Sequence, residues 1–377
     1  MTRWNAEDLR AATLGRQFPE RVGTGPEDVL ALFAHLGPVQ SQVPRAPFLT
    51  ASSRAPGGAY PTVRDLFAAY RLVKTSSLRG TVHTTVAGQY AWVDAVARNV
   101  RSRTLARELG LTRRTAAQVE AELESYADVG WRSRAELVAH LRSWLVEHES
   151  STSATRLTGT YRENLVWGHS GLLRRPPDER WEKRTDVLHR RASALLPGLE
   201  PVSPAAALTE LTRVHLRAAG PLTRRDLAWF SGSGLAQVDA AVASLGEEVL
   251  RGPGPGEEEY VDLAEPPPVR SSGLGVRLLP EYDALLVGYH QSHRHRFLSP
   301  SELDAVWSKV NGQCAPLVLH DDRVVGTWRT VARGRGTEVE VTLLPGHRAP
   351  PEDELGAAAG AAAAGLGLEL TSVGVRR

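Results

Sequence analysis

The fold is decided by residues 204–263, which read PAAALTELTRVHLRAAGPLTRRDLAWFSGSGLAQVDAAVASLGEEVLRGPGPGEEEYVDL. Apolar residues recur at helical spacing over Ala205–Ala219, and Gly220-Pro221 ends the predicted helix. Thr223-Arg-Arg-Asp226 has the form of a capping box, in which each end residue accepts a hydrogen bond from the backbone of the other. A second helix is therefore predicted from this point through Phe230.

A third helix and a hairpin follow the turn at Ser231–Gly234. Apolar spacing indicates the helix over Leu235–Leu245, and Gly246 stands in the position of a C′ glycine. Val249–Arg251 and Tyr260–Leu263 are typical of two short strands joined by a loose Gly-Pro turn. This order is the winged-helix form of the helix-turn-helix, whose last helix usually faces a nucleic-acid groove. Winged helices also serve as protein-binding and structural modules, so the fold alone does not decide the function.

Two weaker copies of the pattern lie upstream. Trp131–Leu137 repeats the capping-box helix entry, and a shorter helix is predicted over Asn164–Leu172, followed by a hairpin over Leu173–Trp181. In the N-terminal part, helices are predicted over Pro26–Leu36 and Thr62–Leu72. These segments favour a diverged tandem repeat.

A strand is predicted in the N-terminal copy over Ser77–Thr85, whose β-branched content is high. Because Arg79 and His83 are four residues apart, a strand of period two would place them on one face.

After about residue 265 the predicted secondary structure becomes rich in β-strands, and Pro266–Pro268 is typical of a linker. A turn is predicted at His320–Arg323, and an Ala/Gly-rich helix after Ala349. The strands are predicted over Val276–Leu279, Leu285–Val287, Leu317–Leu319, Val324–Arg329 and Val339–Leu344. The sequence thus predicts an α+β protein of tandem winged-helix modules with a β-rich C-terminal region. Its domains would span 1–125 (N-terminal winged-helix-like), 126–200, 201–265 and 266–377.

The composition indicates the cellular compartment in which the protein works and whether its surface could bind a negatively charged partner. The chain has 377 residues, 42% hydrophobic, and its single cysteine, Cys314, cannot form an internal disulfide, so a reducing cytoplasmic compartment is expected. No segment is long and apolar enough to span a membrane, and no secretory signal is recognisable. Net charge is only +2, yet six arginines and one acid lie between Arg98 and Arg114. That run is either a solvated helix face or a phosphate-binding surface.

Several kinds of site are disfavoured by the motifs. The sequence lacks a phosphate-binding P-loop, a Rossmann fingerprint and a Gly-x-Ser-x-Gly elbow, so we expect no nucleotide cofactor and no serine hydrolase. The histidine-rich segment 290–296 matches no zinc spacing, and its arginines would repel a cation, so no metal is expected. We expect instead a loop on a hairpin that meets phosphate or a groove through four side chains, His293, Arg294, His295 and Arg296.

The segment Leu36–Phe48 contains two glutamines, Gln40 and Gln42, in a loop stiffened by three prolines. Here the sequence resembles the winged-helix DNA glycosylases of the AlkZ and YcaQ type, over most of the chain. The resemblance is carried by Gln40-Ser-Gln42, Leu78-Arg-Gly-Thr-Val-His83, Leu222–Leu227, Leu279–Tyr289 and Val325–Arg329. The Gln-x-Gln form is more similar to the AlkZ branch.

The resemblance implies a C-shaped scaffold around a DNA channel, in which Gln40 and Gln42 are catalytic. It also implies excision of bulky N7-alkylguanines, in some members interstrand crosslinks, as self-resistance in antibiotic producers. The expected partner is double-stranded DNA carrying alkylated purines, reached at the nucleoid. Because the repeats lie within one chain, a monomer is expected.

The residue chemistry agrees with this expectation. The stretch between Asp28 and Arg54 contains no acid, whereas most base-excising enzymes place a carboxylate beside the sugar. An N7-alkylated purine is already cationic and leaves readily, so two amides that position a water can suffice. Uracil and unmodified adenine should then not be excised. Lys74 is the one lysine near this segment in sequence, so a monofunctional reaction that leaves an abasic site is favoured over Schiff-base chemistry.

The other candidate DNA contacts are Arg45, Arg79, His83, Arg224 and Arg225. Packing of His83 inside the protein is an equally good interpretation. Two alternatives to the enzyme remain: a non-enzymatic winged-helix transcription regulator that binds DNA, and a winged-helix array that binds protein. Regulators commonly dimerise, and the sequence shows no dimer heptad, which favours the enzyme.

Overall fold

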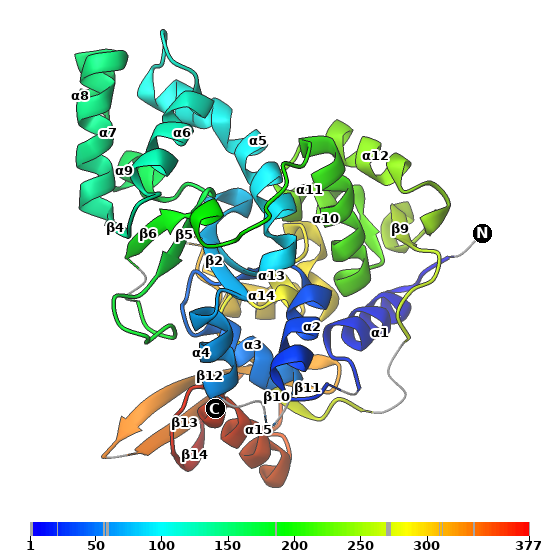
Figure 1. The fold of residues 1–377 in the computed structure, drawn as a ribbon. Coiled ribbons are helices and arrows are strands. Elements are labelled where there is room, and N and C mark those ends of the chain that lie inside the picture. Colours follow the sequence, from blue (N-terminus) through cyan, green and yellow to red (C-terminus); the bar gives the residue numbers. More distant parts are fainter. Residues whose placement is uncertain are drawn as a thin grey trace.

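The computed structural model describes residues 3–20, 22–55, 57, 60–184, 187–268, 273–308, 310, 312–334 and 336–376. After an N-terminal helix, α1 (Ala6–Gln17), three winged helices follow one another and lead to a five-stranded sheet (Figure 1). The predicted α+β class, with tandem winged helices and a β-rich C-terminal region, is confirmed.

The third winged helix matches its prediction element by element. Its three-stranded sheet has the order β7-β9-β8. The predicted capping box is present, because Thr223 Oγ1 accepts from Asp226 N at 3.2 Å and Asp226 Oδ2 accepts from Thr223 N at 3.0 Å. Its elements are α10 (Pro204–Ala219), β7 (Leu222–Thr223), α11 (Arg224–Ser231), α12 (Leu235–Ser244), β8 (Val249–Pro253) and β9 (Glu259–Leu263).

The second winged helix repeats this topology, with strand order β5-β6-β4. The predicted hairpin over Leu173–Trp181 is wrong, because the returning strand lies further on, at β6. Trp181 instead stacks on Phe67 of the first winged helix, with ring centroids 4.9 Å apart. The elements are α6 (Ala116–Tyr126), β4 (Arg132–Ser133), α7 (Arg134–His148), α8 (Ser151–Arg156), α9 (Thr160–Trp167), β5 (Leu172–Arg175) and β6 (Leu188–Arg191).

The first winged helix has the same plan, with strand order β1-β3-β2. Two details of the prediction are wrong. The second helix ends at Ala68, and Leu72 already opens a strand. Arg79 lies in a 3-10 turn, η1 (Leu78–Gly80), with φ of 54°, so it does not share a strand face with His83. The elements are α2 (Pro26–Leu36), β1 (Val39–Gln40), α3 (Ala46–Arg54), α4 (Tyr60–Ala68), β2 (Leu72–Ser76) and β3 (Val82–Val86).

The first and second winged helices share one six-stranded sheet, β1-β3-β2-β5-β6-β4. The junction is the pair Thr75 and Leu173, and Thr75 Oγ1 also donates to Ser170 O at 2.9 Å. A long helix, α5 (Tyr90–Leu109), connects the two modules. Because the sheet is continuous, Gln40 on β1 is fixed relative to the second winged helix.

The arginine-rich run on α5 and its following loop is partly used inside the protein. Arg98 pairs with Asp94 at 2.8 Å and with Glu124 of α6 at 2.6 Å. Arg101 donates to the backbone oxygen of Leu165. The exposed arginines of the run are Arg103, Arg107 and Arg113. A phosphate-binding surface on this run stays a prediction, and it would rest chiefly on those three side chains.

The C-terminal sheet has the order β10-β11-β12-β13-β14, and its last pair, β13 and β14, is parallel. The strand predicted over Leu285–Val287 is wrong, because this segment forms a short helix, α13 (Ala284–Val287). The other elements are β10 (Val276–Leu278), η6 (Gln291–Arg296, 3-10), α14 (Pro300–Val306), β11 (Leu317–His320), β12 (Arg323–Arg333), β13 (Gly336–Leu343), α15 (Glu352–Gly365) and β14 (Leu370–Arg376).

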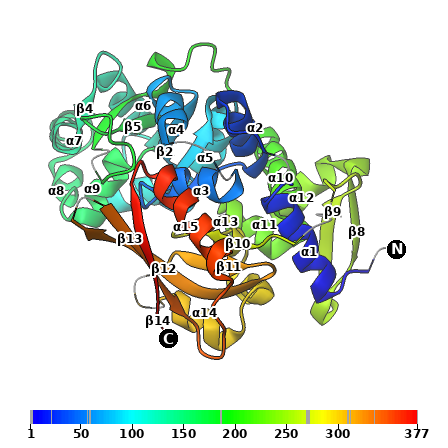
Figure 2. The same ribbon diagram turned by 90° about the horizontal axis from the view of Figure 1, so that it is seen from below.

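One hydrophobic core joins the first winged helix to the C-terminal sheet, so the ranges 1–125 and 266–377, predicted as separate domains, share it. Helix α15 lies between α3 and the sheet and closes this core (Figure 2). Its fully or nearly fully buried members include Phe33, Phe48 and Phe67 from the first winged helix and Val318, Trp328, Val341 and Ala359 from the C-terminal part.

Two buried ion pairs reinforce these connections. Arg54 of α3 pairs with Asp283 at 2.8 Å, and the two side chains are 0% and 1% exposed. Arg16 of α1 pairs with Asp262 of β9 at 2.7 Å. Buried charges need such partners, so both pairs fix the relative position of elements far apart in sequence.

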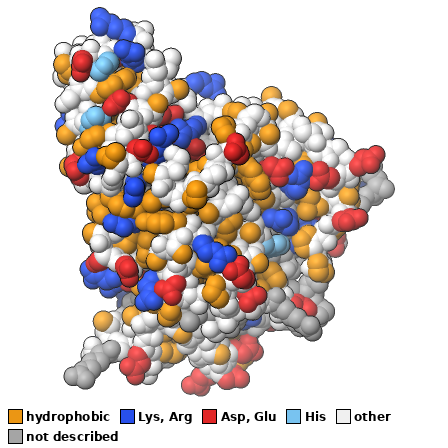
Figure 3. Space-filling model, viewed as in Figure 1, with side chains coloured by type: hydrophobic (Ala, Val, Ile, Leu, Met, Phe, Trp, Pro, Cys, Tyr) orange, Lys and Arg blue, Asp and Glu red, His pale blue; other side chains and the backbone are white. Residues whose placement is uncertain are grey.

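Positive and negative side chains are interspersed on the face shown in Figure 3, rather than gathered into fields of one sign. Within the described ranges, no helix has the combination of length and apolar character that crossing a bilayer requires.

Candidate active site

The two glutamines stand on an extension that only the first winged helix has. In the second and third modules, the last residue of the first strand, Ser133 or Thr223, directly caps the next helix. In the first module that strand ends at Gln40, and helix α3 begins at Ala46. The inserted residues carry Gln42. A capping position has thus been replaced by a loop that presents two amides.

Backbone pairing fixes this loop. Gln40 lies opposite His83 in the β1–β3 ladder, and Ser41 N donates to Val82 O at 2.7 Å. The Ser41 hydroxyl donates to Thr84 Oγ1 at 2.8 Å. Ser41 therefore faces the protein, and the two glutamines on either side of it meet: Gln40 Nε2 donates to Gln42 Oε1 at 3.4 Å. Gln40 is 8% exposed, whereas Gln42 is open to solvent.

Arg79 sets the orientation of these amides. Its Nη2 donates to Gln40 Oε1 at 3.2 Å, and its Nη1 donates to Phe230 O at 2.5 Å and to Trp229 O at 3.3 Å. Because a guanidinium only donates, the Gln40 atom that faces it is the carbonyl oxygen, and the Gln40 amide nitrogen is left to donate to Gln42. Burial, with the charge of Arg294, lowers the pKa of Arg79 to about 10, so it stays protonated at neutral pH. The sequence predicted a DNA contact for Arg79; the structure ties it to the end of α11.

His83 and Arg45 are also used internally. His83 is buried, and its Nδ1 lies 3.1 Å from both Ser77 Oγ and Thr81 O, which confirms the packing interpretation. Burial and the charge of Arg79 lower the pKa of His83 to about 3. Arg45 pairs with Glu281 at 2.5 Å, so its charge is at least partly used inside the protein. Burial argues against a direct DNA contact by His83, whereas DNA contact by Arg45, whose side chain is 23% exposed, stays a prediction.

A pocket of about 630 Å³ opens beside Gln42. Two carboxylates, Glu281 and Asp304, line it, although the sequence around Gln40 contains no acid. Glu281 belongs to the segment Leu279–Tyr289, to which we assigned no role because it is about 240 residues away from the loop. The remaining lining residues are Val43, Arg184, Tyr282, Ala305, Val306, Ser308, Gln313, Cys314, Ala315 and Pro316.

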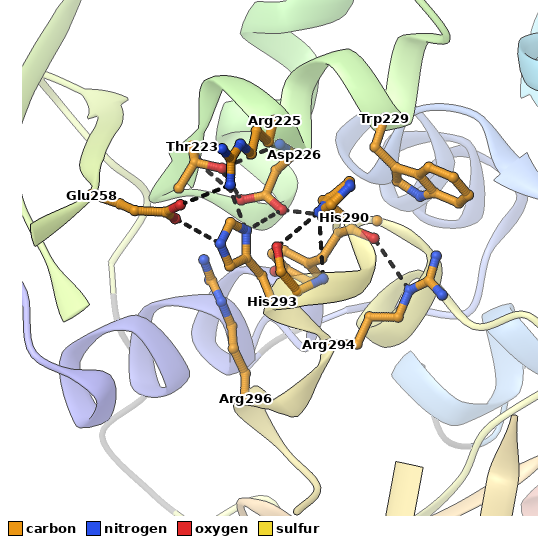
Figure 4. Close-up of polar contacts among 12 residues, drawn as sticks. Thr223, Arg225, Asp226, Trp229, Glu258, His290, His293, Arg294 and Arg296 are labelled. Atoms are coloured by element: carbon orange, nitrogen blue, oxygen red, sulfur yellow. Dashed lines mark hydrogen bonds and ion pairs between the residues drawn. The ribbon is translucent and has the colours of Figure 1, made fainter. Parts of the chain in front are cut away.

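The histidine-rich segment is not the exposed hairpin loop that we predicted from the sequence. It forms the 3-10 helix η6, and His293 is buried between two carboxylates (Figure 4). His293 Nδ1 donates to Asp226 Oδ1 at 2.9 Å, and Nε2 lies 2.7 Å from Glu258 Oε2. Asp226 also accepts from His290 N at 2.9 Å. The segment therefore anchors the third winged helix to the C-terminal part.

The two arginines of this segment are buried as well. Arg294 lies 4.0 Å from the Trp307 ring centroid and 4.9 Å from that of Trp229. Arg296 donates to Thr13 Oγ1 at 3.1 Å. DNA contact by His293, Arg294 and Arg296 is corrected for this reason, while His295 is exposed and stays a prediction.

Arg224 and Arg225 also stay predictions as DNA contacts. Their side chains are 53% and 58% exposed at the start of α11. Each has an acidic neighbour: Arg224 pairs with Asp239 of α12, and Arg225 with Glu258 at 3.3 Å. Helix α12 itself carries no Lys or Arg, so of the two helices of the helix-turn-helix only α11 could supply charge for a phosphate.

The His293 network predicts a pH dependence of stability. Burial opposes the positive charge on His293, but the hydrogen bond to Asp226 and the charges of Asp226 and Glu258 raise its pKa. Because the folded pKa exceeds the unfolded value, the contribution is complete at low pH and is lost as pH rises through the folded pKa. We expect the free energy of unfolding of wild type to fall, relative to His293→Gln, as pH rises from about 6.5, the unfolded value, through the raised folded pKa. Urea unfolding at each pH measures it; parallel curves would contradict the charged bridge.

Two other side chains near the site that could react, an amine and a thiol, are buried. Lys74 is buried, and its Nζ donates to Trp181 O at 2.8 Å. Burial raises the pKa of the Cys314 thiol to about 12, as expected for a structural cysteine. Within the part of the chain that the structure describes, no group of three or more His, Cys, Asp or Glu side chains is arranged to hold a metal ion.

Comparison with known proteins agrees with this geometry. A sequence model of the family described as DNA glycosylase AlkZ-like matches residues 33–365. The chain is 28% identical over 342 residues to an interstrand DNA cross-link repair glycosylase of Streptomyces sahachiroi, which covers 88% of each chain. It superposes on the solved structure of the Streptomyces sahachiroi DNA glycosylase AlkZ with a TM-score of 0.80 at 22% identity, over 99% of this chain and 100% of that one. At 22% identity the structural likeness shows the fold, whereas the family model spans most of the chain.

Proposed function

This chain belongs to the AlkZ-like family of DNA glycosylases, and on that premise we propose that it hydrolyses the N-glycosidic bond of N7-alkylguanine in duplex DNA. The observation that carries the proposal is the oriented pair of amides, Gln40 and Gln42, of which Gln42 lines a pocket. Cationic N7-alkylpurines need little help to leave, so the remaining task is to hold a water against the anomeric carbon.

The amides are arranged for this task. Arg79 takes one lone pair of Gln40 Oε1, and Gln42 Oε1 accepts from Gln40, which leaves each carbonyl oxygen a second lone pair for a water hydrogen. Gln42 is exposed and would contact the water and the sugar directly. Gln40 is mostly buried and would act chiefly by holding Gln42 and the water.

We further propose that the substrates include bulky adducts and interstrand crosslinks, and that the protein confers resistance to a DNA-alkylating natural product. This is supported by the relative from Streptomyces sahachiroi, whose name describes crosslink repair. Such a protein would act on double-stranded DNA at the nucleoid, as a monomer.

We infer a monofunctional reaction that leaves an abasic site. Schiff-base chemistry needs an amine that can reach C1′, and the Lys74 amine is buried and hydrogen-bonded to the backbone. Lys183 is exposed next to Arg184 at the pocket, so it is the amine to test. Borohydride treatment during turnover should trap no covalent protein–DNA complex with wild type or with Lys183→Arg.

The proposal is tested by base release from duplexes that carry N7-methylguanine, a bulky N7-guanine adduct, uracil or no lesion. Release from the first two, and not from the others, is the expected result. Binding of every duplex with equal affinity and no release would favour a winged-helix regulator, and absence of DNA binding would favour a protein-binding array.

Substitution of Arg79 distinguishes a role in positioning Gln40 from a role in binding DNA. In Arg79→Ala the Gln40 amide loses its partner, so we expect single-turnover base release to fall about 10- to 100-fold while the Kd for lesion DNA changes less than about threefold. Arg79→Lys should not restore the rate, because an ammonium cannot bridge Gln40 and the two α11 carbonyls as a planar fork does. Added guanidinium at low concentration should partly rescue Arg79→Ala. A loss confined to affinity would instead support a DNA contact.

A further inference from the structure

We propose that the pocket beside Gln42 binds the substituent carried on N7 of the damaged guanine, and thereby determines which adducts the protein releases. The substituent class is an extended organic group that carries hydrogen-bond donors. This inference rests on the proposed function, because it assigns the pocket to the same reaction.

Position is the first argument. In a purine, N7 and the glycosidic N9 are both bonded to C8, so a group on N7 emerges next to the bond that is cleaved. If the two amides hold a water at C1′, the substituent must leave the base close to the catalytic loop. Gln42 and Val43 of that loop form one wall of the pocket. The space is therefore located where an N7 substituent has to go.

Size is the second argument. Ligand pockets of proteins commonly enclose about 300–1,000 Å³, and this one is about 630 Å³. A methyl group on N7 would leave nearly all of it empty, so the volume has no use in the repair of simple methylation. A bulky adduct could instead be accommodated without being drawn whole into an enclosed base pocket.

The polar groups of the lining set the chemistry. Glu281 and Asp304 contribute carboxylates to the lining and Gln313 an amide, and the fork of Arg45 holds Glu281, with its Nε at 3.2 Å and 3.3 Å from the two carboxylate oxygens. A held carboxylate is a fixed acceptor, so it favours amine, amide or hydroxyl groups on the ligand. Val306 and Pro316 are among the residues that add apolar surface.

The same carboxylates disfavour the obvious alternative occupant. A DNA phosphate in this space would meet Glu281 and Asp304, and although Arg45 offsets the charge of Glu281, carboxylate oxygens offer a phosphate no hydrogen-bond donor. Among those lining residues that the structure describes, Arg184, which is exposed, is the one basic side chain. The pocket thus fits the adduct better than it fits the duplex backbone.

The test narrows the pocket and compares two substrates. Ala305 lines the pocket from α14, so Ala305→Phe fills part of it, and Ala305→Ser is the matched control of unchanged size. Single-turnover release is measured from N7-methylguanine and from an N7-guanine adduct with a long aminoalkyl-aryl group. For Ala305→Phe we expect release of the long adduct to fall about tenfold or more, with N7-methylguanine release within about twofold of wild type.

A second variant tests the chemistry of the pocket independently of its size. Asp304→Asn should reduce release of the aminoalkyl adduct more than release of the same adduct with the amine replaced by a methyl group. Equal losses on both substrates in Ala305→Phe, or unchanged release of the long adduct in both variants, would overturn the inference. Failure of wild type to release either base would overturn the proposed function itself, which is a different outcome.

Discussion

Replacing Gln40 and Gln42 together with alanine should reduce base release from alkylated duplex by about three orders of magnitude while DNA affinity changes by less than about threefold. Loss of one fixed hydrogen-bonding group at a reacting centre commonly costs about 10²–10³ in rate. The two amides act through one hydrogen bond, so the single variants should be strongly non-additive.

The two single alanine variants should differ in how much rate they lose. Gln42→Ala removes the exposed amide, and we expect it to have nearly the effect of the double variant. Gln40→Ala leaves Gln42 in place but removes the link to Arg79, so the Gln42 amide becomes free to rotate, and a smaller loss follows. Gln42→Asn, which shortens the side chain by one carbon, should lose rate as well, because reach matters.

The measurement is a single-turnover time course with saturating protein on N7-methylguanine duplex. Gln118→Ala, at an exposed glutamine near the start of α6, is the matched control and should keep full activity. A double variant that retains more than about a tenth of the wild-type rate would move the site elsewhere, and the carboxylates Glu281 and Asp304 would then be the next residues to examine.

Asp283→Ala should lower the free energy of unfolding by about 3–5 kcal/mol, the largest stability effect of any single change that we predict. Asp283 accepts from Arg54 Nη1 at 3.0 Å and from Nη2 at 2.8 Å, and Oδ1 also accepts from Leu285 N at 3.0 Å. Removing the carboxylate leaves a guanidinium buried without its counter-charge and removes the cap of α13.

Urea unfolding, with the midpoint as readout, measures this effect. The control is Asp65→Ala, since the Arg64–Asp65 pair is 38% and 64% exposed and such pairs contribute only about 0–1 kcal/mol. The paired change Arg54→Met with Asp283→Leu should be milder than Asp283→Ala, because no charge is left buried. A midpoint for Asp283→Ala equal to that of the control would show that water reaches Arg54.

Local sequence rules predicted the winged helices well. Capping boxes at Ser133 and Thr223 are satisfied within four residues, so they can be recognised without knowledge of the rest of the chain. The apolar run Leu285–Val287 shows the limit of such rules, because a short buried run suits a strand and a helix equally. Here the Asp283 cap and the pair with Arg54 decide for the helix.

The roles of the charged side chains were harder to predict from the sequence than the secondary structure was. A guanidinium in a basic stretch looks like a phosphate contact, yet Arg294 stacks on Trp307 and Arg296 binds Thr13, residues remote in sequence. For the candidate site, the pair of glutamines was predicted from a resemblance to a family. Glu281 was not predicted as a site residue, because only folding brings it to the same pocket as Gln42. Arg79 was predicted as a DNA contact. Its hydrogen bond to Gln40 depends on the packing of η1 against α11, which local sequence patterns do not reveal.

The core shared by the first winged helix and the C-terminal sheet has a consequence for synthesis on the ribosome. Phe33 and Phe48, on either side of the Gln40 loop, are buried together with Trp328 and Val341. At about 5–20 residues per second, the roughly 300 residues from Gln42 to Val341 take about 15–60 s to make. Throughout that interval the nascent N-terminal module lacks its cover. Active protein therefore arises only after β13 has been made, and a polypeptide stopped before β13 would expose apolar surface and be a target for chaperones and proteases.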